Sequence, residues 1–361
     1  MDDDILKKFL DECRDIADGL SDLGSKTPSS SREPPFNRNL VCEQEDYYLY
    51  RYQSINEKVD RSKQKYFKTI LIVYSLINRA TIVDLERNKS FVGDLLESGH
   101  DIYLLDWKEF GSGAKKLSLA DYSFRFIDEC VQAIKALTNF SNINLVGLCQ
   151  GGVFSLLYAL KHKSEINSLA LISTPIDFKT ERDTMSKILN HLDLNLLKSI
   201  PYISGSMLNS FFNMLAPYSN LQKKYLTLLE RQKDPEFVER FYLMENWRWD
   251  SPNVSGSVLA EFIDVFYIKN SFIDGIVKVN GNELKIGSKL NFPILNLYGL
   301  RDRLVPPESS QALSRLLDGE INYSELGFDC GHIGMYVSRK GEKSPGRTIG
   351  SWLGQDISDK I

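Results

Sequence analysis

Cysteine, histidine and net charge are all scarce in this chain of 361 residues. The five cysteines are an odd number without metal-ligand spacing, so the sequence indicates neither a disulfide framework nor a structural metal site. A formal net charge of -4 gives no electrostatic reason to expect nucleic acid or an anionic membrane as a partner. These features favour a protein of the reducing cytoplasm and disfavour nucleic-acid binding.

Long apolar runs and a positively charged start are also absent. Met1 is followed by Asp2-Asp3-Asp4, the reverse of a signal peptide, and no apolar run is long enough for a transmembrane segment. Residues 1–46 instead combine an amphipathic helix, Ile5 to Leu23, with a linker rich in serine and proline. The helix docks either on a partner or on its own domain, and the sequence leaves both open.

Beyond residue 46, β-prone apolar runs alternate with helical patterns, which is typical of βαβ units and a mostly parallel sheet. We expect an α/β core over residues 47–174 and 291–361, with a helical cap (lid) inserted over residues 175–290. The aromatic residues of the cap either line an apolar channel or form the cap's own core. The expected strands are Tyr47–Tyr52, Thr69–Tyr74, Ile102–Asp106, Ile143–Val146, Ser168–Ile172, Pro293–Tyr298 and Asn322–Leu326.

The most informative stretch is Gly147-Leu-Cys-Gln-Gly-Gly152, which lies between an apolar run and a helical pattern. Its Gly-x-Cys-x-Gly spacing is that of the nucleophile elbow of the α/β-hydrolase fold, where the nucleophile occupies a sharp strand-to-helix turn. Cys149 is therefore the candidate nucleophile. The alternative is a small buried core cysteine in a tight turn.

An acid and a histidine follow Cys149 in the chain order that this fold uses. Asp302 lies just beyond the expected strand Pro293–Tyr298, and His332 lies beyond the expected strand Asn322–Leu326. Of the four histidines, His332 is the one at an expected strand end. The imidazole would withdraw the thiol proton, while the carboxylate would either orient the ring or accept a proton from a second substrate.

The same fold predicts an oxyanion hole made of backbone N–H groups. We expect the N–H of Gln150 to supply one donor and the loop near Val73 and Tyr74 to supply the other. A sulfur nucleophile exchanges with a thioester at nearly even energy, which favours acyl transfer from coenzyme A over plain ester hydrolysis. The coenzyme A thioester is then the substrate, and we expect no cofactor and no metal.

Several segments outside the elbow resemble the catalytic subunit of the two-subunit polyhydroxyalkanoate synthases, of class III rather than class IV. The resemblance covers Tyr47 to Leu353. The matching segments are Leu71-Ile-Val-Tyr-Ser-Leu-Ile-Asn-Arg79, Asp101-Ile-Tyr-Leu-Leu-Asp-Trp107, Leu119-Ala-Asp-Tyr122, Thr174-Pro-Ile-Asp-Phe-Lys179, Met244-Glu-Asn-Trp247, Asp250-Ser-Pro252, Leu304-Val-Pro-Pro307 and Gly331-His-Ile-Gly-Met-Tyr-Val-Ser338.

The resemblance implies that Cys149 carries the growing hydroxyacyl chain, that His332 activates it, and that Asp302 helps to activate the 3-hydroxyl of the incoming monomer. It implies an acyltransferase that polymerises short (R)-3-hydroxyacyl-coenzyme A thioesters, typically 3-hydroxybutyryl-coenzyme A, into polyhydroxyalkanoate. It also implies a homodimer, a second subunit of the E type, and a place on the surface of cytoplasmic polyhydroxyalkanoate granules.

Three positions depart from the family pattern. Arg303 stands where the family often has histidine, Ala80 where it often has proline, and Cys330 where it usually has glycine. Arg303 either acts on Asp302, attracts a coenzyme A phosphate or is simply solvated. Cys330 either forms a regulatory disulfide with Cys149 or is an inert small residue.

Two other classes of function fit parts of the pattern. A cysteine-type α/β-hydrolase (a thioesterase, an esterase or a dienelactone-hydrolase-like enzyme) would pass the acyl group to water. A non-enzymatic binding protein of the same fold would need an incomplete catalytic group, and the sequence contains all three residues.

Overall fold

The computed structural model describes residues 34–53, 68–111, 116–182, 184–215, 224–287, 290–317, 322–337 and 343–354. They fall into two compact units, one with the residues up to Ser204 and from Pro252 onward, and one with Gly205–Ser251. The predicted helix Ile5–Leu23 lies outside the described residues. Within them, every helix is too short or too polar to cross a bilayer.

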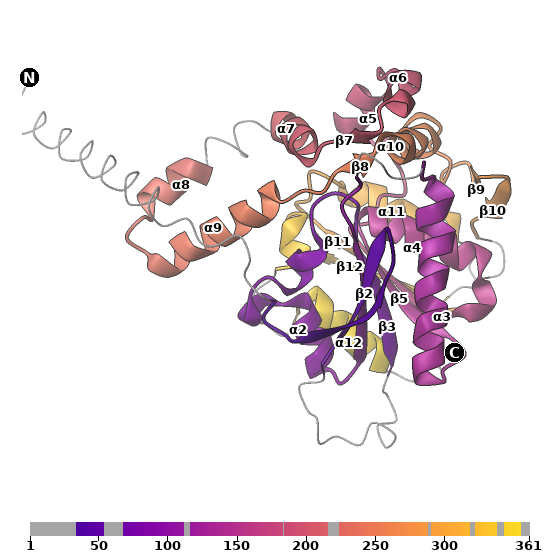
Figure 1. Ribbon diagram of the computed structural model, residues 1–361, viewed down its shortest axis with the longest axis horizontal. Coiled ribbons are helices and arrows are strands. Elements are labelled where there is room, and N and C mark those ends of the chain that lie inside the picture. Colours follow the sequence, from indigo (N-terminus) through magenta and orange to yellow (C-terminus); the bar gives the residue numbers. More distant parts are fainter. Residues whose placement is uncertain are drawn as a thin grey trace, which may run out of the picture. The chain divides into compact units, whose positions relative to one another are not determined.

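An eight-stranded sheet runs through the first unit in the order β1-β2-β4-β3-β5-β6-β11-β12 (Figure 1). β2 pairs antiparallel with β1 and β4, and the strands from β4 to β12 pair parallel, as predicted. Two short antiparallel pairs, β7 with β8 and β9 with β10, stand apart from it. The strands are β1 (Arg38–Glu43), β2 (Tyr47–Tyr52), β3 (Thr69–Val73), β4 (Asp101–Trp107), β5 (Ile143–Leu148), β6 (Ile166–Ile172), β7 (Tyr202–Ile203), β8 (Val254–Ser255), β9 (Ile276–Val279), β10 (Asn282–Lys285), β11 (Ile294–Gly299) and β12 (Tyr323–Phe328).

The central strands consist of buried apolar runs. Every residue of β3, β5 and β11 is buried, as expected for parallel strands that are covered on both faces. All seven predicted strands are present, with ends that differ by at most two residues. β1 was not predicted, and residues 1–46, which contain it, were assigned to the N-terminal helix and linker. Its half-exposed residues show no regular apolar pattern that would indicate a strand.

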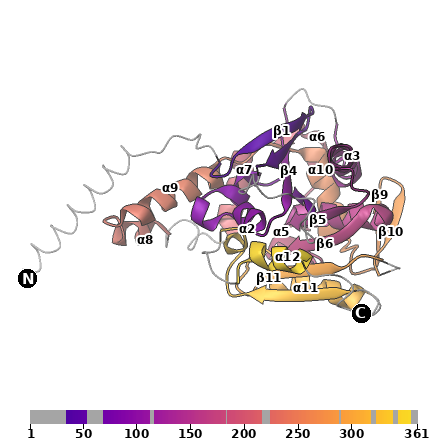
Figure 2. The ribbon, with the colours of Figure 1, turned by 90° about the horizontal axis from the view of Figure 1, so that it is seen from below.

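Helices cover both faces of this sheet. α2 and α12 lie on one side and α3 on the other, and α4 packs against β5 and β6 (Figures 1 and 2). The α-helices are α2 (Phe91–Glu97), α3 (Phe126–Thr138), α4 (Gln150–Lys161), α5 (Thr184–Leu189), α6 (Leu194–Ser199), α7 (Gly205–Leu215), α8 (Lys224–Glu230), α9 (Pro235–Trp249), α10 (Gly256–Phe262), α11 (Pro307–Leu316) and α12 (Pro345–Gly354). Short 3-10 or π-helical turns are η2 (Ala80–Asp84), η3 (Arg87–Lys89), η4 (Asp121–Arg125), η5 (Lys163–Glu165), η7 (Ile263–Ile268) and η8 (Ile333–Met335).

The residues between β6 and β11 divide between the two units. Residues 175–204 and 252–290 belong to the unit that contains the sheet, whereas α7, α8 and α9 form the second unit. Phe262, Phe266 and Phe272 are buried. The ring of Phe266 contacts those of Phe262 and Phe272, so the three contribute to the core of the first unit. The role of the inserted residues as a lid stays a prediction.

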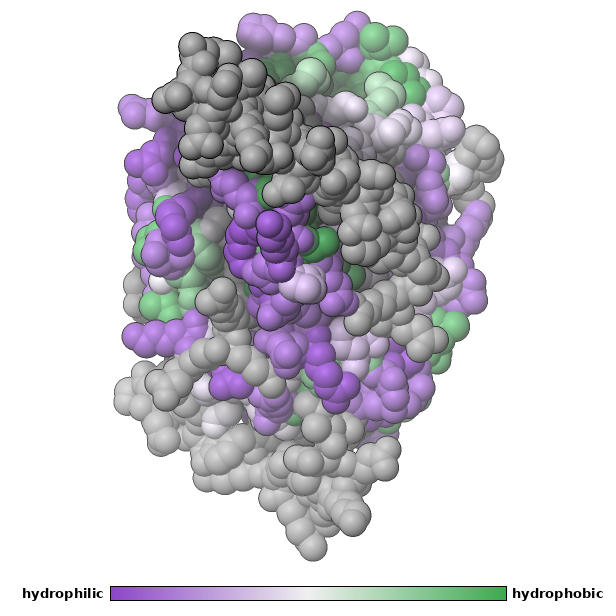
Figure 3. Space-filling model, turned by 90° about the vertical axis from the view of Figure 1, so that its left-hand side faces the viewer, coloured by the Kyte–Doolittle hydropathy of each residue, from purple (hydrophilic) through white to green (hydrophobic). Residues whose placement is uncertain are grey.

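The described surface is mainly polar on the face shown in Figure 3. Polar and charged residues cover most of it, and apolar residues form small separate patches.

Candidate active site

Cys149 occupies the turn between β5 and α4 in a conformation that few non-glycine residues adopt. Its backbone has φ 52° and ψ -121°, and its N–H donates to the carbonyl of Ile172 at 2.8 Å. Such backbone strain persists only where the surrounding structure enforces it, and here the neighbouring strand β6 does so. The thiol is thereby placed at the carboxyl edge of the sheet, as the elbow motif predicts.

Two glycines after Cys149 let three segments approach closely. A Cβ on Gly151 would overlap the carbonyl oxygens of Val73 and Tyr74, and a Cβ on Gly152 would overlap the side chain of Thr174. The start of α4 therefore packs directly against the ends of β3 and β6. Glycine is required at both positions by this packing.

Asp302 and His332 meet at the ends of β11 and β12, which are neighbouring parallel strands. Nδ1 of His332 lies 2.7 Å from Oδ2 of Asp302, and the other oxygen, Oδ1, accepts the backbone N–H groups of Leu304 and Val305, each at 2.9 Å. The Asp302 side chain is fully buried. Both of its oxygens are thus occupied by partners within the protein.

The Asp302–His332 contact determines the charges of both groups. Burial alone would raise the pKa of Asp302, but the imidazole charge and the hydrogen bonds outweigh it and hold that pKa below its usual value. Burial alone would lower the pKa of His332, but the Asp302 carboxylate, a thiolate at Cys149 and the hydrogen bonds to both raise it well above its usual value. The site therefore favours a carboxylate beside a ring that readily takes a proton.

Cys149 lies beside the ring of His332, close enough for its sulfur to raise the pKa of the imidazole. Since Nδ1 faces Asp302, the ring nitrogen available to the sulfur is Nε2. Cys149 is a free, half-buried thiol. The structure thus brings Cys149, His332 and Asp302 into one chain of contacts, in the order required for proton transfer from sulfur to imidazole.

Two tyrosines lie beside this group: Tyr74, expected at the oxyanion hole, and Tyr336, which the sequence analysis did not single out as a site residue. The hydroxyl of Tyr336 is 3.3 Å from Nε2 of His332, and the ring of Tyr336 meets that of Tyr74 edge to face at 6.1 Å. Both rings are buried, at 1% and 4% exposure. Tyr336 follows His332 by four residues within the family-like segment Gly331–Ser338, and its place in that segment was the signal for it in the sequence.

Gln150 connects the elbow to the loop after β3. Its side-chain oxygen accepts the backbone N–H of Leu76 at 3.1 Å and the hydroxyl of Ser75 at 3.3 Å. On the other side of this loop, the indole of Trp107 donates to the carbonyl of Tyr74 at 2.9 Å. The loop that was expected to complete the oxyanion hole is thus fixed to Gln150, the residue that was expected to supply the first donor.

The two unusual residues near the site lie apart from the proton-transfer contacts. Arg303 is exposed, and Cys330 is a free thiol whose Sγ lies 3.4 Å from Sδ of Met335. The structure therefore contains no disulfide between Cys330 and Cys149. Burial raises the pKa of Cys330, so it is a poor nucleophile.

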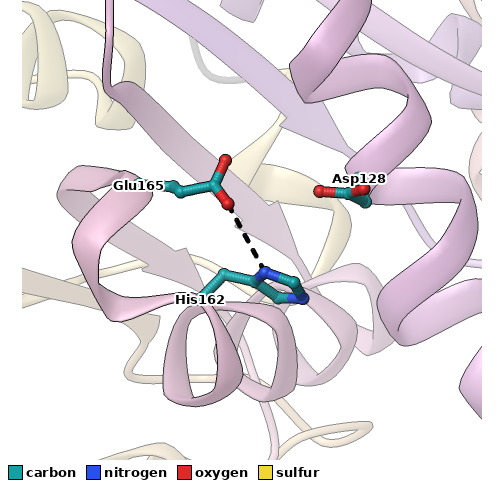
Figure 4. A group of neighbouring side chains, drawn as sticks. All are labelled: Asp128, His162 and Glu165. Carbon is teal, nitrogen blue, oxygen red and sulfur yellow. Dashed lines mark ion pairs between the residues drawn. The ribbon is translucent and has the colours of Figure 1, made fainter.

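A second group of titratable residues, Asp128, His162 and Glu165, lies between α3 and the start of β6 (Figure 4). Lys135 donates to Oε2 of Glu165 at 2.5 Å, and the hydroxyl of Tyr158 donates to Oδ1 of Asp128 at 2.9 Å. A cation would have to compete with the ammonium group of Lys135. We therefore assign this group to the packing of α3 and α4 rather than to metal binding.

Comparisons with known proteins agree with this architecture. The family model described as alpha/beta hydrolase fold matches residues 68–338. The chain is 34% identical to the poly(3-hydroxyalkanoate) polymerase subunit PhaC of Allochromatium vinosum, over 98% of both chains. It is 35% identical to the subunit of that name from Thiocystis violacea (98% of this chain, 97% of the relative) and 33% identical to that of Synechocystis sp. (97% and 93%). The chain has the α/β-hydrolase fold and belongs to the family of poly(3-hydroxyalkanoate) polymerase PhaC subunits.

Proposed function

We propose that this chain is the catalytic subunit of a class III polyhydroxyalkanoate synthase. Its substrates are short (R)-3-hydroxyacyl-coenzyme A thioesters, with 3-hydroxybutyryl-coenzyme A as the typical monomer, and its products are polyester and free coenzyme A. The observation that carries the proposal is the placement of the Cys149 thiol, on the strained turn after β5, beside an imidazole that a buried carboxylate holds in place. Family membership indicates which acyl groups the thiol receives.

The first half-reaction loads the enzyme. The thiol proton of Cys149 passes to Nε2 of His332, and the sulfur attacks the thioester carbonyl of the substrate. The carbon–sulfur bond to coenzyme A then breaks, and the imidazolium returns the proton to the departing thiolate. The acyl group is left as a thioester on Cys149.

The second half-reaction extends the polymer. The 3-hydroxyl of a second acyl group attacks the acyl-Cys149 carbonyl while His332 takes the hydroxyl proton. An ester bond forms, the bond to Cys149 breaks, and the departing sulfur takes the proton from His332, which regenerates the thiol. No cofactor takes part, since coenzyme A enters and leaves as part of the substrate.

We assign Asp302 to the orientation of His332 rather than to direct activation of the hydroxyl. Oδ2 faces Nδ1 of His332, and Oδ1 already accepts two backbone N–H groups. A substrate hydroxyl would have to displace one of these partners. The buried carboxylate instead fixes the ring tautomer, with the proton on Nδ1 and the free lone pair on Nε2.

The proposed oxyanion hole uses the backbone N–H of Gln150 with a second N–H from the Val73–Tyr74 end of β3. Gln150 is the first residue of α4, so its N–H has no acceptor within the helix. The contacts of Gly151 with Val73 and Tyr74 bring the end of β3 to the same place.

We further propose that the active form is a homodimer that associates with an E-type subunit on the surface of polyhydroxyalkanoate granules in the cytoplasm. Membership of the polymerase family supports these assignments. We propose no nucleic acid as a partner.

Product analysis tests the function. The purified chain, with and without the E-type subunit, is incubated with 3-hydroxybutyryl-coenzyme A, and free thiol, polymer and free hydroxy acid are quantified. We expect polymer, with an acyl group on Cys149 found by mass spectrometry. Cys149→Ala should abolish thiol release, whereas the control Cys42→Ala on edge strand β1 should retain it.

Two results would contradict the proposal. Sustained coenzyme A release by Cys149→Ala would exclude the covalent route. Free hydroxy acid as the main product would make the chain a cysteine-type hydrolase instead.

A further inference from the structure

Tyr336 is held against the catalytic histidine by one turn of helix. η8 begins directly after His332, and the N–H groups of Met335 and Tyr336 donate to the carbonyls of His332 and Ile333 at 3.2 and 3.0 Å. These bonds span three residues each, as in a 3-10 helix, and fix the backbone between His332 and Tyr336. The two rings accordingly meet edge to face, with centroids 5.6 Å apart.

The hydrogen-bond roles at His332 follow from its partners. Nδ1 faces a carboxylate, which only accepts, so Nδ1 carries a proton and the neutral ring offers its lone pair at Nε2. The hydroxyl of Tyr336, 3.3 Å from Nε2, is then a donor. Nε2 of the neutral ring therefore accepts from the phenol of Tyr336, and it faces the neighbouring thiol of Cys149 as the group whose proton it takes.

This arrangement changes when the thiol proton moves. Once Nε2 carries a proton it no longer accepts, and the phenol hydrogen must find another acceptor. Tyr336 also lies close enough to Cys149 to interact with a negative charge there. A thiolate is a stronger acceptor than a neutral imidazole, because hydrogen bonds to charged groups are the stronger ones.

We propose that Tyr336 stabilises the thiolate of Cys149, donating its hydrogen bond to Nε2 of His332 before proton transfer and to the sulfur afterwards. In this exchange the S–H bond breaks, the electron pair stays on sulfur, and the proton forms the N–H bond at Nε2. Tyr336 keeps its own proton throughout. The inference rests on the assignment of Cys149 and His332 as the reacting pair.

The surroundings keep Tyr336 a donor. Burial, followed by the negative charges of nearby groups, raises the pKa of Tyr336 well above its usual value. Burial also raises the pKa of Tyr74, the other phenol near the sulfur. The titratable groups near Tyr336 are His332, Cys149, Tyr74, Asp302 and Cys330.

The test measures the pH dependence of Cys149 alkylation by iodoacetamide, with the modified cysteine identified by peptide mass spectrometry. Tyr336→Phe keeps the ring and removes the donor, so the acid limb of the profile should move to higher pH. Near neutral pH, the alkylation rate should fall about three- to tenfold. Tyr52→Phe, a buried tyrosine on β2, is the control and should leave the profile in place.

A second variant keeps the inference testable if Tyr336→Phe folds poorly. Incorporation of 3-fluorotyrosine at position 336 preserves the shape and makes the hydroxyl a stronger donor, so the acid limb should move to lower pH. An unshifted profile, or a rate lowered equally at every pH, overturns the inference.

The alkylation assay needs no acyl substrate, so its outcome is separate from that of the proposed function. A shifted alkylation profile in a chain that makes no polymer with the E-type subunit would retain the role of Tyr336 and reject the polymerase assignment.

Discussion

Nδ1 of His332 lies 2.7 Å from Oδ2 of Asp302, although 30 positions of sequence separate the two residues. Their loops leave β11 and β12, which pair in parallel register, so the sheet itself brings the side chains together. The Asp302 side chain is fully buried and that of His332 is 11% exposed. Each group therefore depends on the other for its charge, since water screens neither.

Asp302→Asn should weaken the fold in a pH-dependent way. The lowered pKa of Asp302 adds stability that is lost only in strong acid. The raised pKa of His332 adds stability that is complete below the ordinary imidazole pKa and is lost as the pH rises through the raised value. We expect a loss of about 3 kcal/mol in unfolding free energy near pH ~6 and a smaller loss in alkali.

Denaturant unfolding across this pH range measures the loss. Asp329→Asn is the matched control, because it breaks the exposed pair with Arg301 and should change stability by less than about 1 kcal/mol. If Asp302→Asn lowers the unfolding free energy by the same amount at every pH, protonation of Asp302 and His332 is not coupled to folding.

Gln150→Met should slow catalysis without weakening substrate binding. The change removes the acceptor for Ser75 and Leu76 and leaves a buried N–H unpaired, so the loop of the proposed oxyanion hole loses its support. We expect kcat for coenzyme A release to fall about tenfold with little change in KM. Gln150→Glu keeps the acceptor oxygens and should retain more activity, and equal rates in the Met variant and the parent chain would refute this role.

Gly151→Ala should destabilise the protein because its Cβ would overlap the carbonyl oxygens of Val73 and Tyr74. Backbone must move to make room, at a cost of about 2 kcal/mol or more. Thermal unfolding measures the effect against Gly111→Ala, where nothing lies within 4 Å of the added atom. Similar melting temperatures for the two variants would contradict the packing described here.

Asp84 should make stability fall as the pH rises. Its carboxylate is buried and accepts the N–H of Phe36 at 3.2 Å and the hydroxyl of Ser90 at 2.6 Å. Burial raises the pKa of Asp84 to about 6. The folded state thus holds a proton that the unfolded chain releases near pH ~4. The unfolding free energy therefore decreases as the pH rises from this value to the raised pKa of Asp84.

Asp84→Asn removes this titration. The unfolding free energy of the variant, relative to the parent chain, should therefore increase by about 2 to 3 kcal/mol between pH ~4 and pH ~7. Parallel stability curves for the two proteins would show that Asp84 titrates normally.

The sequence predicted the part of the fold that depends on local pattern. Strands such as β3 and β11 are continuous apolar runs, and burial on both faces requires such runs. β1 was not predicted because it forms by pairing with β2 at the edge of the sheet and has no buried apolar face that would give an alternating pattern. The hairpin of β9 and β10 was missed although Asn280-Gly281 between them is a strong turn signal.

The candidate site also has residues that the sequence predicted and contacts that it did not. Cys149, Asp302 and His332 could be found because chain order and strand ends restrict where they occur. The hydrogen bonds that support the site could not be found in this way. Those between Leu76 and Gln150 and between Trp107 and Tyr74 join segments that come together only when the whole sheet forms. Tyr336 also needed the structure, because four residues of spacing do not reveal which atom its hydroxyl meets.

The ladder between β7 and β8 has a consequence for how this protein can evolve. It pairs Ile203 with Val254, so the chain leaves the sheet-bearing unit and returns to it at one point. An insertion attached in this way closes a loop whose ends are already fixed, and the entropic cost of lengthening such a loop grows only slowly. Residues 205–251 can therefore be extended, shortened or replaced without changing the register of any catalytic strand. Selection can reshape this segment while Cys149, Asp302 and His332 stay in place.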